Sequence, residues 1–67
     1  MDFEAYLEGQ LHGETILDMY EEGVSVAHPA NIYPNDEVAQ ASFHYGRLAV
    51  LALQDYTVSM FGVLTKL

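Results

Sequence analysis

The chain has 67 residues, enough for one small domain, and ten acidic side chains against two basic ones give a formal net charge of -8. Because 51% of the residues are apolar and none is cysteine, the composition excludes a disordered acidic tail, a disulfide scaffold and a thiolate zinc module. Direct nucleic-acid binding is not expected, because neutralising phosphates takes clustered Lys and Arg. The N-terminus shows no basic and apolar signal regions, so a cytoplasmic location is expected.

The first expected element is a helix over residues 2–22. Asp2 is a suitable N-cap, acidic residues in the first turn suit the positive end of the helix dipole, and Gly23 is a suitable stop. At 100° per residue, apolar side chains gather on one face; they are Phe3, Tyr6, Leu17, Tyr20 and Val24. Beside that face a four-residue spacing of small residues predicts the close approach of another helix; these are Ala5, Gly9 and Gly13.

Residues 24–34 are expected to form a connection, because they contain two prolines and the residue before a proline disfavours helix. Asn35 is the expected N-cap of a second helix over residues 36–66. Beyond Tyr56 the residues become more β-branched, and Gly62 interrupts them. The first interpretation of this stretch is a helix bent or broken near residues 55–57, and the second is a terminal strand over Thr57–Leu64.

The second helix is apolar almost all the way round, so one amphipathic helix cannot cover it. A membrane span is not expected, because polar residues break each apolar stretch before it reaches the required length. Self-association is predicted instead, since small domains often complete a core by forming oligomers, most commonly dimers. The expected fold is therefore all-α: a two-helix hairpin, one domain of residues 1–67, dimerising into a four-helix arrangement. The residues assigned to the dimer interface are Phe43, Val50, Leu51, Leu53, Met60 and Phe61.

The charge is concentrated in one half of the chain. Residues 1–37 hold nine of the ten acidic residues and no Lys or Arg, so they carry -9, whereas residues 38–67 carry +1. Several acidic residues repeat at i,i+4, and each such like-charge pair destabilises a helix by roughly 0.2–0.5 kcal/mol. The pattern indicates either a solvated face or a surface for a cationic partner. The residues assigned to partner binding are Glu4, Glu8, Glu14, Asp18, Glu21 and Glu22, with Tyr33 in the connection as an added contact.

A metal site or a catalytic site has weaker support. Side chains with metal-ligating chemistry are present, as Glu8, His12 and His28 or as Glu14, Asp18 and Glu21. The Glu-x-x-His spacing of di-iron helices is absent, however, and so are the other metal-binding, phosphate-binding and nucleophile motifs. No enzyme activity, metal or cofactor is therefore expected.

The leading hypothesis is a non-enzymatic protein-binding module, an inhibitor or adaptor that docks its carboxylate-rich helix on a basic patch of a nucleic-acid-binding protein. In composition the chain resembles small phage or mobile-element proteins that inhibit a host enzyme by binding it, and its carboxylates would then mimic phosphates. No motif carries this resemblance, so no residue role is transferred. The alternatives are a structural or assembly subunit that acts through the apolar second helix, and a small metal-dependent helical enzyme.

Overall fold

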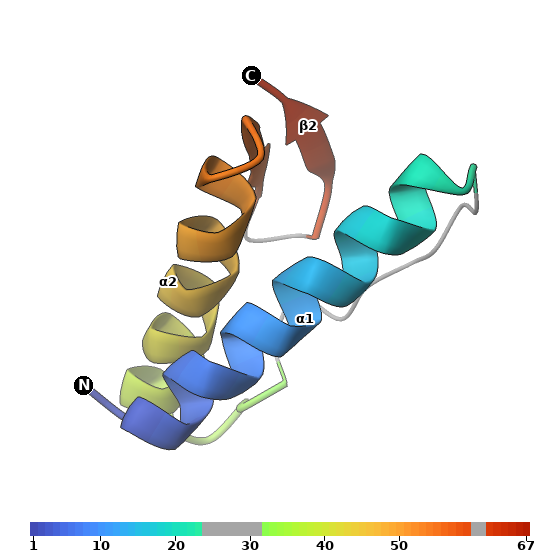
Figure 1. The fold of residues 1–67 in the computed structure, drawn as a ribbon. Coiled ribbons are helices and arrows are strands. Elements are labelled where there is room, and N and C mark those ends of the chain that lie inside the picture. The colour runs from blue at the N-terminus through green and yellow to red at the C-terminus, as the bar shows by residue number, and fades with distance from the viewer. Residues whose placement is uncertain (24–31, 60–61) are drawn as a thin grey trace.

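The computed structural model describes residues 1–23, 32–59 and 62–67. Two helices lie side by side, and two short strands pair antiparallel beyond the end of the second helix (Figure 1). The elements are α1 (Phe3–Glu21), α2 (Glu37–Ala52), β1 (Tyr56–Val58) and β2 (Leu64–Lys66). The prediction of two packed helices is confirmed, and the all-α class is corrected by the two-stranded sheet.

Helix α1 begins and ends where its capping residues predict. The side chain of Asp2 accepts a hydrogen bond from the backbone N–H of Ala5, with a donor–acceptor distance of 3.1 Å. At the other end Gly23 has a φ of 78° and donates its N–H to the carbonyl oxygen of Tyr20. A left-handed residue directly after the last turn is the usual glycine stop.

The expected apolar face of α1 is largely wrong. Phe3 and Tyr20 are exposed, Leu17 is buried, and Val24 lies outside the described residues. The side facing α2 is instead made of small residues together with the buried pair Ile16 and Leu17. Small side chains define this face because the two backbones come too close for larger ones.

The close approach predicted from the small-residue spacing is confirmed. A Cβ atom added to Gly9 would overlap the carbonyl oxygen of Phe43, and one added to Gly46 would overlap the carbonyl oxygen of Tyr6. Farther along, Gly13 lies against the backbone of Arg47. Only glycine lets two helix backbones approach this closely.

These contacts follow the same order along both helices, so α1 and α2 point in the same direction (Figure 1). The positive ends of two helix dipoles therefore lie at one end of the molecule, and acidic residues stabilise both. Asp2 and Glu4 begin α1, while Asp36 and Glu37 begin α2. The N-cap of α2 is Asp36 and not the predicted Asn35, since the Asp36 side chain accepts the N–H of Ala39 at 3.0 Å.

The predicted continuation of the second helix to residue 66 is wrong. Helix α2 ends at Ala52, and Asp55 takes a φ of 62° in the turn that follows, close to the expected break. The strands then pair Tyr56 with Lys66 and Val58 with Leu64. β-Branched residues on both sides of a glycine favour such a hairpin over a helix. The alternative of a strand over Thr57–Leu64 was closer, although the structure has two short strands there.

The core consists of two clusters on either side of the glycine contact. One holds Ile16, Leu17, Leu51 and Val58, and the other holds Ala5, Ala39 and Phe43. The β1–β2 hairpin thus covers part of α2, where a second copy of the chain was expected to pack. The exposed surface of 4409 Å² is close to the roughly 4200 Å² expected for a folded monomer of this mass. The single chain buries a core of ordinary extent, and dimerisation stays a prediction.

Candidate partner-binding groove

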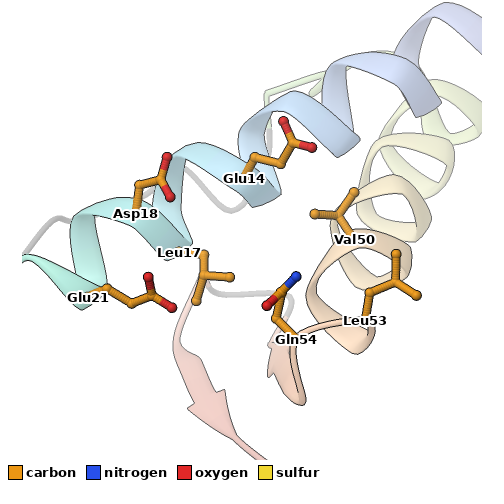
Figure 2. Close-up of a pocket in the computed structure, with 7 residues that line it drawn as sticks. All are labelled: Glu14, Leu17, Asp18, Glu21, Val50, Leu53 and Gln54. Atoms are coloured by element: carbon orange, nitrogen blue, oxygen red, sulfur yellow. The ribbon is translucent and has the colours of Figure 1, made fainter.

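A groove of about 300 Å³ lies between the C-terminal parts of the two helices (Figure 2). The helices are closest at the glycine contact and diverge toward their C-terminal ends, which opens the space there (Figure 1). Seven residues line it: Glu14, Leu17, Asp18, Glu21, Val50, Leu53 and Gln54. Three of the six carboxylates assigned to partner binding therefore share one groove.

The groove combines an acidic side with an apolar floor. In Figure 2 the side chain of Glu21 extends from α1 toward the space between the helices, whereas Glu14 and Asp18 stand along the outer edge of α1. All three residues are exposed and line the groove. Leu17 is almost fully buried beneath them, whereas Leu53 on the opposite side is 83% exposed. A ligand in this groove would meet negative charge and apolar surface together.

The electrostatic environment of the groove is negative for two reasons. Its residues lie in the C-terminal parts of α1 and α2, and the dipole of each helix leaves about half a negative charge at that end. Neither Arg47 nor Lys66, the two cationic side chains of the chain, is among the lining residues. Glu21 in the last turn of α1 even opposes its own helix dipole. Such a locally unfavourable arrangement is typical of functional surfaces.

The remaining predicted carboxylates lie elsewhere. Glu22 is the C-cap residue of α1. Glu4 and Glu8 are exposed in the N-terminal half of the helix, near Tyr33. The pKa of Tyr33 is raised, first by desolvation and then by the negative charges of neighbouring carboxylates, namely Glu8, Asp2, Glu4 and Asp36. The predicted acidic face is thus divided: three of its carboxylates line the groove, Glu22 is at the C-cap, and Glu4 and Glu8 lie near the N-terminal end.

Tyr33 is a packed residue as much as a surface one. Its ring contacts Phe43 edge-to-face with centroids 5.9 Å apart, and its backbone N–H donates to Oε1 of Gln40 at 3.1 Å. The side chain is half-buried against the core cluster of Ala5, Ala39 and Phe43. It does not line the groove.

The residues assigned to a dimer interface are distributed unevenly. Phe43 and Leu51 are buried within the single chain, so the structure corrects their placement on an outer surface. Val50 and Leu53 line the groove and remain accessible. Met60 and Phe61 lie outside the described residues.

The metal-ligand sets are not assembled. Within residues 1–23, 32–59 and 62–67, no three His, Asp or Glu side chains are arranged to hold a metal ion. Glu14, Asp18 and Glu21 therefore line the groove without forming a three-ligand site. His28 lies outside the described residues.

Arg47 is fully buried, at 0% exposed, and this burial was not predicted from the sequence. Its Nη2 lies 2.8 Å from Nδ1 of His44, and its guanidinium carbon lies 5.1 Å from the ring centre of Phe43. Nε and Nη1 have no hydrogen-bond partner in the part of the chain that the structure describes. The spacing to Phe43 and Leu51, four residues on either side, places all three on one helix face and was the available signal. Because this cation is withdrawn from the surface, the exterior is more acidic than the net charge indicates.

No family model matches the chain, and neither a curated protein nor a solved structure is significantly similar to it. None of the helices formed by the described residues is long and apolar enough to cross a membrane. The functional assignment therefore depends on the groove and on the charge around it.

Proposed function

We propose that this protein is a non-enzymatic binding module whose acidic groove docks on a basic patch of a nucleic-acid-binding protein and thereby inhibits or recruits it. The observation that supports this most is the position of Glu14, Asp18 and Glu21, which line one groove at the negative ends of two helices. A row of carboxylates on a rigid helix presents negative charge much as phosphates do. Such mimicry suits a phage-type inhibitor of a host enzyme acting in the cytoplasm.

The energetics favour a surface that combines charge with apolar contact. An exposed ion pair contributes only about 0.2–1 kcal/mol, so three carboxylates alone give weak binding. Charge complementarity mainly raises the association rate and fixes the orientation of the partner. Leu53 and Val50 supply the adjoining apolar surface. The complex should therefore weaken, but not vanish, as salt screens the charges.

The proposal is tested by capture from a host lysate on immobilised protein, at low and high salt and with duplex DNA as competitor. The groove variant carries Asp18→Lys and Glu21→Lys, and a control with the same net charge carries Glu8→Lys and Glu22→Lys. We expect the groove variant to lose a partner that the control retains, and duplex DNA to displace that partner. If the variant with reversed groove charges still captures the partner, the acidic-groove proposal is wrong. If duplex DNA does not displace the partner, the proposed mimicry of nucleic acid is wrong.

The assembly-subunit alternative has one supporting observation. Leu53, Val63 and Leu67, in and beyond the turn after α2, are large apolar residues that remain exposed. If a homodimer forms through this end of the molecule, Leu53→Ser should dissociate it, as measured by sedimentation equilibrium. A parent protein that stays monomeric at high concentration would remove this alternative.

A further inference from the structure

The outer surface of α1 carries an unusual apolar stripe. Phe3, Leu7 and Leu11 are 67%, 43% and 59% exposed, and each lies one helical turn after the last. Residues at a four-residue spacing are neighbours on a helix surface. A contiguous exposed apolar stripe is typical of an interaction site, whereas scattered apolar residues are not.

The stripe continues directly into the acidic side of the groove. At 100° per residue, six exposed residues fall within an arc of about 80°: Phe3, Leu7, Leu11, Glu14, Asp18 and Glu21. We call this row the α1 seam. Its N-terminal half is apolar and its C-terminal half is acidic, and the acidic half borders the groove.

We propose that the α1 seam binds an amphipathic helix of a partner protein, whose apolar residues lie at one end and whose Lys or Arg residues lie at the other. This inference rests on the proposed function and names the segment that the module recognises. Helices dock on such surfaces through side chains at i, i+3, i+4 and i+7. In the groove, the alkyl stem of a lysine can lie on Leu17 and Leu53 while its ammonium group reaches Asp18 or Glu21.

A second copy of the chain does not fit this surface. In a parallel pair, Asp18 and Glu21 would face the same carboxylates of the other copy. In an antiparallel pair, they would face the apolar side chains of Phe3 and Leu7. The parallel arrangement thus places like charges against each other, and the antiparallel arrangement places charges against apolar surface. Both kinds of contact disfavour binding. The complementary occupant is therefore a different chain that carries positive charge.

Three labelled helical peptides of equal length test the inference by fluorescence anisotropy. The block peptide has leucines at one end and lysines at the other, the interleaved peptide has the same composition without separation, and the third has only lysine and alanine. We expect the block peptide to bind at least about tenfold more tightly than the interleaved one. Leu7→Ser should weaken the block peptide roughly fivefold and leave the lysine–alanine peptide unchanged.

The matched control for Leu7→Ser is Val38→Ser, since Val38 is an exposed apolar residue on α2 outside the seam. It should leave all three affinities unchanged, and circular dichroism should show both variants folded. If all three peptides bind equally and salt weakens the binding, the proposal that the α1 seam recognises an amphipathic helix is wrong. The proposal of an acidic binding module would still hold. No binding of any basic peptide would overturn both proposals. A dimer of the parent that Leu7→Ser dissociates would instead assign the seam to a second copy.

Discussion

Nη2 of Arg47 lies 2.8 Å from Nδ1 of His44, one turn earlier on α2. A guanidinium has only donors, so His44 must be neutral and present its lone pair on Nδ1. Desolvation and the charge of Arg47 both lower the pKa of His44 from its ordinary value of 6.5. Protonation of His44 would leave the buried cation without this acceptor.

The stability of the protein should therefore contain an acid-sensitive contribution from His44. Because the folded-state pKa is below 6.5, this contribution is complete above pH 6.5 and is lost as pH falls from there toward the lowered pKa. His44→Gln retains an acceptor for Arg47 but does not titrate. Both proteins are unfolded with urea over a range of pH. Below pH 6.5 the free energy of unfolding of the parent should fall relative to that of His44→Gln. A difference independent of pH would contradict the account.

Replacing Arg47 with Met should not destabilise the protein. Nε and Nη1 of this buried guanidinium have no hydrogen-bond partner among the described residues. Exchanging a poorly paired buried charge for an apolar side chain of similar volume is often neutral or stabilising by roughly 1–4 kcal/mol. Urea denaturation should give an unchanged or higher free energy of unfolding. A loss of more than about 3 kcal/mol would show that the guanidinium makes strong interactions.

The contact between α1 and α2 should fail when Gly46 acquires a side chain. Alanine gains about 1 kcal/mol of helix propensity, but its Cβ would overlap the carbonyl oxygen of Tyr6. The helices must separate, so we expect Gly46→Ala to lower the free energy of unfolding by at least about 2 kcal/mol. Gly13→Ala is the control. Its Cβ would lie 3.2 Å from the carbonyl oxygen of Arg47, so the neighbouring backbone would need to move only slightly. Equal effects of the two substitutions on the thermal midpoint would contradict the described contact.

The C-terminal hairpin should contribute to the core. Val58 on β1 is buried beside Leu51 and Ile16, so Val58→Ala should lower the free energy of unfolding by about 1–3 kcal/mol. Thr65 on β2 is exposed, and Thr65→Ala should have a much smaller effect. Similar losses for both substitutions would contradict the packing of the hairpin on the helices.

The sequence predicted the features that local chemistry determines. Asp2 and Gly23 mark the ends of α1 because a cap and a left-handed stop act on neighbouring backbone groups. The spacing of Gly9 and Gly13 predicted the helix contact, since close approach requires small residues at that interval. The i,i+4 repeat placed Glu14 and Asp18 one helical turn apart, and both line the groove.

Features that depend on tertiary contacts were missed. Apolar periodicity placed Phe3 in the core, but the glycine contact turned a different face of α1 inward. A long connection does not determine direction, so the common orientation of the helices was not predicted. Val58 was predicted to be helical because apolar periodicity does not show its pairing with Leu64, which stabilises the strand. The burial of Arg47 was missed because charged residues are rarely fully buried.

The central claim is that the groove carboxylates, and not negative charge in general, bind the cationic partner. The most direct measurement compares the affinity of the block peptide for two doubly neutralised variants. Glu14→Gln with Asp18→Asn removes two groove charges, and Glu8→Gln with Glu22→Gln removes two charges outside it. The account predicts a loss of roughly tenfold for the first pair and at most about twofold for the second. Equal losses, or no loss from the groove pair, would contradict it.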